Sequence, residues 1–288
     1  MRRGPGATNM RAMPETPREA DPRMRVFDRQ MLRRRRDRAA DRFPAHDFLV
    51  RRAGEDIVDR IAGVNRSFGI AADLGAHRGS LRTATADAAL QDGKIGTLIS
   101  ADLSAGMLAH AEGARVVADE EMLPFADKSL NLVTSILSLH WVNDLPGTLI
   151  QIRRADREKV TPILRDCGAL LQRAGFALPV ADTDRVTVRY ADPLRLMAEL
   201  RGMGETNALS ERRRTPLKRG TLIRAAEIYR EKFGLPDGRV PATFDIVIVT
   251  GWAPHESQQK PLAPGSANTR LADALGTEEL PAGDKPPR

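Results

Sequence analysis

Cysteine is almost absent from this chain of 288 residues, because Cys167 is its only cysteine. A single cysteine excludes an intrachain disulfide and any zinc site built from several cysteines. Long apolar stretches are missing as well, and none approaches the roughly 18 residues that a membrane-spanning helix requires. The first residues lack the apolar core of a secretory signal peptide, and their acidic residues and prolines argue against a mitochondrial presequence.

Aromatic residues make up only 4% of the chain, and lysine is so scarce that arginine supplies nearly all of the positive charge. The net charge of +7 is compatible with binding to nucleic acid or to an anionic surface. A nucleic-acid binder is therefore one hypothesis, although it rests on charge alone. The densest basic run, "RRRRDR" at residues 33–38, is broken by Asp37 and has no interleaved aromatic residue. It predicts a solvated helix face.

The middle of the chain alternates between strand patterns and helix patterns. The expected strands are residues 69–75, 95–103, 114–119 and 130–142. The expected helices between them are residues 80–90 and 104–111, the second with Ser104 as its N-cap. This alternation is typical of a parallel α/β sheet with right-handed crossovers, and we expect a Rossmann-like fold with helices on both faces.

Four segments are expected along the chain. They are a disordered tail at residues 1–23, a helical N-terminal extension at 24–66, the α/β domain at 67–255 and a loose tail at 256–288. Beyond residue 155 the pattern predicts helices at 166–176 and 221–233 and strands at 184–190 and 242–252.

Polar or glycine-rich residues follow each of the first four expected strands: "DLGAHRG", "ADLS", "ADEE" and "SLHW". Ligands of open parallel sheets bind beyond the carboxyl ends of the strands, so these residues are expected to face one ligand. The first turn does not have the G-x-G-x-x-G spacing of dinucleotide folds, and by itself it is also compatible with an ordinary tight turn.

Individual roles follow from these positions. Asp102 is expected to accept both hydroxyls of a ribose, although a capping aspartate is the alternative. Asp119 and Glu120 are expected near an adenine amino group, or else in a solvated acidic turn. His140 is the candidate catalytic base or hydrogen-bond donor, with a packed rim histidine as the alternative, and Trp141 is expected to line the pocket.

A metal site is not expected. The sequence contains no Walker loop, nucleophile elbow or H-E-x-x-H motif.

Several motifs resemble class I methyltransferases that depend on S-adenosyl-L-methionine. The chain is most similar to the methyltransferase-like assembly factors of respiratory complex I, which are related to the malonyl-carrier-protein methyltransferases. The matching motifs are "FDRQMLRRRRDRAA", "ADLGAHRGS", "ADEEMLPF", "SILSLHWVNDLPGTL", "LLQRAGF", "LRGMGETNAL" and "GWAPHESQQKPLAPGSA". The glycine loop is generic to the fold, whereas "LHWVNDLPG" and "W-x-x-HESQ" are specific to this branch.

The resemblance implies S-adenosyl-L-methionine as the cofactor and a protein acceptor, with a complex I subunit as the candidate, as the partner. The cofactor-binding residues that it implies are Asp73, Gly75, Ala76, His77, Gly79, Asp102, Leu103, Asp119 and Glu120. The glycine loop would line the methionine end of the cofactor, and His77 stands where many relatives have glycine.

A segment near residues 155–165 departs from the resemblance. After "LIQIRRA" the family continues with a fifth strand and a helix, whereas "DREKVTPILRDCG" follows directly here. We therefore expect a methyltransferase sheet that lacks its usual fifth-strand region, with a closed gap or an unpaired edge.

Two main functional hypotheses follow. The first is a methyltransferase-like enzyme that acts on a protein acceptor in complex I assembly, with arginine hydroxylation of a complex I subunit as the alternative. The second is a non-catalytic assembly scaffold, which the missing segment favours. The expected location is the cytoplasm of a bacterium or the mitochondrial matrix of a eukaryote.

Overall fold

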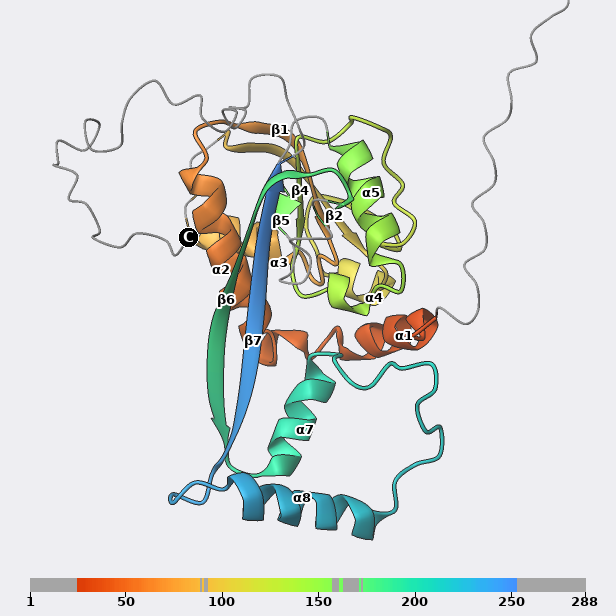
Figure 1. The fold of residues 1–288 in the computed structure, drawn as a ribbon, viewed down its shortest axis with the longest axis vertical. Helices are drawn as coiled ribbons and strands as arrows, with labels where there is room; N and C mark the ends of the chain where they lie inside the picture. The colour runs from red at the N-terminus through yellow and green to blue at the C-terminus, as the bar shows by residue number, and fades with distance from the viewer. Residues whose placement is uncertain are drawn as a thin grey trace, which may run out of the picture. The chain divides into compact units, whose positions relative to one another are not determined.

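Two β-sheets organise the part of the chain that the structure describes (Figure 1). The computed structural model describes residues 25–88, 90, 93–156, 161–162, 171 and 173–252. All of them belong to the first of two compact units, Met1–Ala253. No helix among these residues is long and apolar enough to cross a bilayer. The two predicted tails and residues 166–170 lie outside the described ranges.

The first sheet is parallel and has the strand order β3-β2-β1-β4. Its strands are β1 (Phe68–Leu74), β2 (Ile95–Asp102), β3 (Ala114–Val117) and β4 (Leu132–Ser135). Ala71 and Ala72 of the central strand are both fully buried, although neighbouring residues of a strand point to opposite faces. The sheet is therefore covered on both sides, which confirms the predicted Rossmann-like α/β fold.

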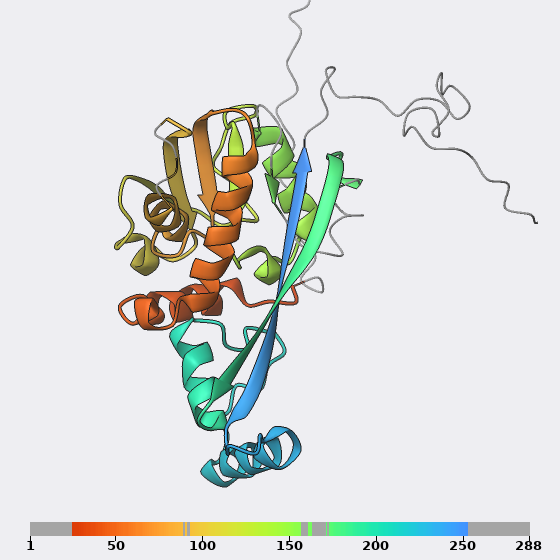
Figure 2. The ribbon, with the colours of Figure 1, turned by 90° about the vertical axis from the view of Figure 1, so that its left-hand side faces the viewer.

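Helices cover both faces of this sheet. On one face, α2 (Phe48–Gly63) and α3 (Ser80–Asp87) share a hydrophobic core with Ala71 and Leu132. On the other face, α5 (Leu145–Ala155) shares a core with Ala72 and Val133. Figure 2 shows α2 lying along the sheet. Alternate residues of the same strands thus build the two cores, and the carboxyl ends of the strands remain free for other elements.

Two helical elements precede α2. Helix α1 (Arg29–Ala39) is capped by Asp28, whose Oδ1 accepts a hydrogen bond from the Met31 amide at 2.9 Å. A short 3-10 helix, η2 (Phe43–Ala45), follows. Helix α1 packs on α4 (Ala105–Leu108), where Asp37 Oδ1 accepts hydrogen bonds from Ser104 Oγ at 2.5 Å and from the Gly106 amide at 3.0 Å. These contacts hold α1 beside the carboxyl end of β2.

The second sheet is antiparallel and has the order β5-β7-β6. It consists of β5 (Thr161–Pro162), β6 (Ala177–Tyr190) and β7 (Val240–Trp252). The chain between β6 and β7 contains α7 (Pro193–Gly202) and α8 (Arg219–Phe233), which lie at the far end of the long hairpin (Figure 1). The predicted departure near residues 155–165 falls partly outside the described ranges. Within those ranges, β5 pairs with β7, and no strand pairing joins the two sheets.

The fourth predicted strand was too long. It was expected over residues 130–142, but β4 ends at Ser135, and residues Leu139–Trp141 form a 3-10 helix, η3. The chain turns between them because Leu137 adopts a φ of +46°, which no strand accommodates. His140 and Trp141 therefore follow a turn after the strand rather than closing it.

Candidate active site

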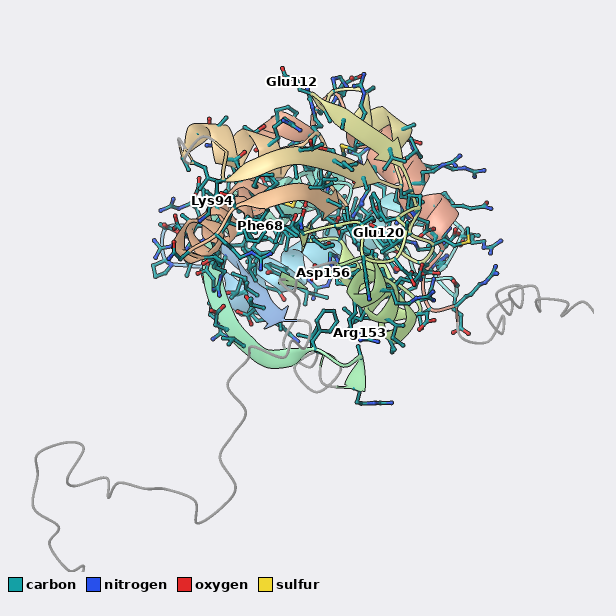
Figure 3. The ribbon with its side chains drawn as sticks, turned by 90° about the horizontal axis from the view of Figure 1, so that it is seen from above. Phe68, Lys94, Glu112, Glu120, Arg153 and Asp156 are labelled. Atoms are coloured by element: carbon teal, nitrogen blue, oxygen red, sulfur yellow. The ribbon has the colours of Figure 1, made fainter. Side chains whose placement is uncertain are left out.

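The carboxyl ends of the parallel strands bring several predicted residues together. Figure 3 shows Glu120 at the end of the strands opposite to Phe68 and Lys94, which lie where β1 and β2 begin. Asp73 and Asp102 lie at the carboxyl ends of the two central strands, β1 and β2, and both are buried. The strand ends therefore form one acidic rim, as the strand order requires.

The loop after β1 depends on glycine at two positions. Gly75 has a φ of +65°, and Gly79, the residue before α3, has a φ of +82°. A Cβ at Gly75 would lie 2.1 Å from the Cβ of Ser138, so a larger residue does not fit. The predicted loop residues Ala76 and His77 are buried between these glycines.

His77 occupies a position that favours glycine, because its φ is +50°. Its ring stacks on Phe43, with 5.1 Å between centroids and 14° between planes, and Nε2 lies 3.1 Å from the carbonyl oxygen of Ile136. Burial and the nearby charge of Arg36 lower the pKa of His77, so the ring is neutral near pH 7. These contacts stabilise the strained backbone and place the ring beside the glycine loop.

Asp102 is fully buried, and both of its carboxylate oxygens are engaged. Oδ1 accepts a hydrogen bond from the Ser104 amide at 2.7 Å, and Oδ2 accepts one from the His77 amide at 2.9 Å. Arg36 Nη1 also lies 3.4 Å from Oδ2. The predicted neighbour Leu103 is half-buried. The two amides fix the carboxylate at the end of β2, and the arginine occupies the side on which a ribose was expected.

Asp73 is a second buried carboxylate at this rim. Its Oδ1 accepts a hydrogen bond from Thr134 Oγ1 at 2.9 Å, whereas its Oδ2 has no hydrogen-bond partner among the described residues. Burial, together with the negative charge of Asp102, raises the pKa of Asp73 to about 7 despite the hydrogen bond from Thr134. Asp73 therefore titrates near neutral pH.

The acidic residues after β3 are bound by an arginine of α1. Arg29 Nη2 lies 2.6 Å from Asp119 Oδ1 and also pairs with Glu120, and its Nε is 3.8 Å from Glu121. Glu120 additionally accepts a hydrogen bond from the Ser138 hydroxyl. Burial opposes the charge of Arg29, but Glu120 and Asp119 raise its pKa above the ordinary value. Asp119 and Glu120 are thus held together at the rim.

Arg36 shows that the expectation for the basic run was wrong at this residue. We expected a solvated helix face, but the Arg36 side chain is fully buried. Its guanidinium faces Asp102, Glu120 at 3.9 Å and Glu205 at 3.8 Å. Burial opposes its charge, and these three carboxylates reverse that effect and raise the pKa of Arg36. These three carboxylates lie opposite α1, and they explain why Arg36 is buried whereas Arg33 and Arg34 are exposed.

Glu205 was not selected from the sequence, although it lies in the quoted motif "LRGMGETNAL". Its Oε2 accepts hydrogen bonds from the indole nitrogen of Trp141 and lies 3.2 Å from His140 Nε2. Its Oε1 has no hydrogen-bond partner within the described ranges. Burial opposes its charge, but His140 and Arg36 lower the pKa of Glu205, so it is ionised at neutral pH. His140 is thus partnered by a carboxylate.

A cavity of about 460 Å³ adjoins this carboxylate. Apolar side chains of α2, α7 and β7 form much of its wall, including Ile57, Leu200 and Ile248. Its polar lining includes His77, His140 and Glu205. The cavity is not lined by Gly75, Asp102 or Asp119, so it lies on the His77 side of the rim. Arg36 connects the cavity to the strand ends, because it contacts both Glu205 and Asp102. Within the described residues, no group of three potential ligands could hold a metal ion.

Comparison with known proteins places these features in a family. A family model described as a methyltransferase domain matches residues 72–159. Arginine-hydroxylase NDUFAF5, mitochondrial, of Danio rerio is 35% identical, covering 87% of this chain and 89% of that protein. Its human counterpart is 34% identical, covering 87% and 83%. A malonyl-[acyl-carrier protein] O-methyltransferase of Methylovorus is 29% identical, covering 80% and 90%.

A solved structure agrees with the fold. A Bacillus halodurans protein assigned to the methyltransferases superposes with a TM-score of 0.51 at 14% identity, covering 70% of this chain and 99% of that one. At this identity the likeness concerns the fold alone.

The methyltransferase-domain match supports S-adenosyl-L-methionine as the cofactor. The donor and acceptor groups of the rim fit this molecule, which carries ribose hydroxyls, an amino group and a positive sulfonium. Asp102, Asp119, Glu120, Glu121 and Glu205 provide five carboxylates, which share the guanidinium groups of α1. A ribose could reach Asp102 only if Arg36 moved away from Oδ2. The residues therefore fit the cofactor, on the condition that one arginine side chain shifts.

Proposed function

The chain belongs to the NDUFAF5 family of methyltransferase-like proteins, and we propose that it is an S-adenosylmethionine-dependent enzyme that modifies an arginine side chain of a protein during respiratory complex I assembly. The observation that carries this proposal is the charge of the site. Five carboxylates at the strand ends and in the neighbouring loops are balanced by only Arg29 and Arg36 among the described residues. Such an excess of negative charge favours cationic ligands.

Three parts of the rim would hold the cofactor. Asp102, fixed by two backbone amides, would accept the ribose hydroxyls, and Asp119 or Glu120 would accept the adenine amino group. The positive-φ loop at Gly75 would admit the methionine end close to the backbone. When bound, S-adenosylmethionine supplies an electrophilic methyl group. The protein then contributes mainly orientation and exclusion of water, which accounts for the sparse catalytic machinery.

The acceptor would enter through the apolar cavity. An arginine side chain has an apolar stem and a cationic end, and the cavity offers an apolar wall with Glu205 beside it. Glu205 Oε1, which has no hydrogen-bond partner in the described part of the chain, would accept a hydrogen bond from the guanidinium. His140 and Trp141 would orient this carboxylate through Oε2. His140 is then a positioning residue for Glu205.

Methyl transfer, which would release S-adenosylhomocysteine and a proton, is one modification that this arrangement supports. Arginine hydroxylation, which would require dioxygen and a two-electron reductant from outside the described chain, is the second candidate. The relatives from Danio rerio and human are named arginine-hydroxylases, which favours hydroxylation. Both candidates use the same acceptor pocket and the same carboxylate. A scaffold without turnover is the third outcome, because Arg36 occupies the ribose side of Asp102. The proposed location follows the assembly role: the bacterial cytoplasm, or the mitochondrial matrix of a eukaryote, since these relatives are named as mitochondrial proteins.

Mass spectrometry of complex I subunits distinguishes these outcomes. Subunits would be compared between cells that lack the gene and cells that express the unchanged chain or the Glu205→Gln variant. We expect an arginine to gain a methylene or an oxygen only with the unchanged chain, since Glu205→Gln removes the charge that binds the guanidinium. If complex I assembled normally without any modified arginine, the result would support a scaffold without turnover and contradict the proposal that the chain is an enzyme. Asp41→Asn, at an exposed acid of α1's C-terminal side, is the matched control.

A further inference from the structure

Arg36 is fully buried, yet its guanidinium is incompletely hydrogen-bonded. Nη1 lies 3.4 Å from Asp102 and Nη2 lies 3.2 Å from the Ser138 hydroxyl, whereas the oxygens of Glu120 and Glu205 are 3.9 Å and 3.8 Å away. Its Nε has no hydrogen-bond partner among the described residues. A buried guanidinium with open donors is unfavourable unless a further acceptor completes it.

The position of this guanidinium relates it to the cofactor. Nη1 contacts Asp102, the acid proposed for the ribose. Nη2 contacts Ser138, whose Oγ would lie 2.2 Å from a Cβ at Gly75, in the loop proposed for the methionine end. Arg36 therefore lies between the two places that the sugar and the amino-acid part of the cofactor would take.

We propose that Arg36 binds the α-carboxylate of S-adenosylmethionine. When the ribose binds to Asp102, the Arg36 guanidinium leaves Asp102 and pairs with the ligand carboxylate instead. This inference rests on the proposed function. A ligand carboxylate brought among five protein carboxylates would be repelled unless a cation lay beside it. Arg29 is already committed to Asp119, Glu120 and Glu121. Within the described part of the site, Arg36 is the guanidinium that remains for this role.

The alternative role for Arg36 is a plug, that is, a side chain that only blocks the ribose position on Asp102. If it only covered Asp102, its removal would open the ribose position, and cofactor binding would strengthen whether or not the ligand carried a carboxylate. The two roles therefore predict changes of opposite direction, and a pair of ligands that differ in one group separates them.

The test compares S-adenosylmethionine with decarboxylated S-adenosylmethionine by titration calorimetry on the full chain. The second compound lacks only the carboxylate and is more positive, so the acidic site alone would favour it. We expect the unchanged chain to bind S-adenosylmethionine at least about tenfold more tightly, as a charge-assisted hydrogen bond allows. Equal affinities, or tighter binding of the decarboxylated compound, would overturn the proposal without any variant.

Two variants of Arg36 and one control variant complete the test. Arg36→Met should lose about tenfold or more in affinity for S-adenosylmethionine and little for the decarboxylated compound, whereas Arg36→Lys should lose less. Arg33→Met, at an exposed residue of the same helix, should change neither affinity. Tighter binding of both ligands by Arg36→Met would establish the plug instead. Binding of neither ligand to the unchanged chain would contradict the proposed function itself.

Discussion

The parallel sheet and the β6–β7 hairpin reach order by different physical means. The parallel strands have four to eight residues and carry fully buried side chains such as Leu132. The hairpin strands have 14 and 13 residues and pair exposed side chains, as in Arg185–Asp245 at 2.7 Å and Thr187–Thr243 at 3.2 Å. Helix α8, at the far end of the hairpin, has no buried residue.

This difference indicates where stability and function reside. Burial and the buried ion pairs stabilise the parallel sheet and α1. The hairpin combines buried residues of β7, such as Val240 and Ile248, with exposed cross-strand pairs and an α8 without buried residues, which contribute little. Regions with few buried apolar contacts open at lower free energy than the core. We therefore expect the hairpin end to exchange its amide hydrogens faster than the rim of the parallel sheet. The following substitutions test this contrast.

The largest loss of stability is expected for Asp102→Ala. This change removes the acceptor of two backbone amides and one partner of the buried Arg36, so the free energy of unfolding should fall by about 3 kcal/mol or more. Urea denaturation measures it. Asp119→Ala is the matched control, because Asp119 also pairs with an arginine of α1 but is 27% exposed, and its loss should cost clearly less. Equal losses would contradict a buried ion network.

Leu132→Ala should follow, with a loss of about 3 kcal/mol. Leu132 is fully buried between the sheet and α2, and its truncation leaves a cavity in the core. The matched substitution in the second region is Ile228→Ala on α8, where the side chain is 37% exposed. Its effect should stay within about 0.5 kcal/mol. Similar effects at the two positions would remove the contrast between the regions.

Asp73→Asn should change stability only at higher pH. The pKa of Asp73 is raised from 3.8 to about 7 in the folded state, so the folded chain binds the proton more tightly than the unfolded chain. The carboxyl therefore costs no stability below pH 4, lowers stability progressively between about pH 4 and 7, and exerts its full effect above pH 7.

The asparagine variant lacks this dependence. We expect it to unfold at higher urea concentration than the unchanged chain at pH 8, and the difference should shrink towards pH 4. Thermal and urea unfolding across this range provide the measurement. A constant difference at all pH values would show that Asp73 does not titrate in this window.

The smallest effect is expected for Arg185→Ala. Its ion pair with Asp245 joins two exposed side chains across the hairpin, where solvent and salt screen the attraction. The urea midpoint should not shift measurably, and added salt should not alter that result. A clear shift would mean that the hairpin depends on its surface ion pairs more than this account allows.

The sequence predicted the elements better than the site. Periodicity located the strands ending at Asp102 and at Trp252 and the N-cap at Ser104, because these depend on local patterns. The fourth strand was extended too far because an apolar run continues through the turn at Leu137. The roles predicted for the rim residues stay predictions, although the structure brings Asp73, Asp102 and Glu120 to one edge.

Arg36 and Glu205 could not have been predicted from local patterns. Four consecutive arginines look alike in a sequence, and only the carboxylates contributed by distant segments decide which one is buried. Glu205 lies 65 residues from His140 along the chain, and a pair at that separation has no periodic signature. The resemblance did include both segments among its motifs, which was the available indication that they matter.

Calorimetric titration of the full chain with S-adenosylmethionine, beside the Asp102→Asn variant, tests the central claim most directly. We predict saturable binding to the unchanged chain and a loss of about tenfold or more in the variant, because the neutral amide cannot accept both ribose hydroxyls as a carboxylate does. Absence of binding to the unchanged chain, or equal binding by the variant, would contradict the assignment of the acidic strand ends to this cofactor.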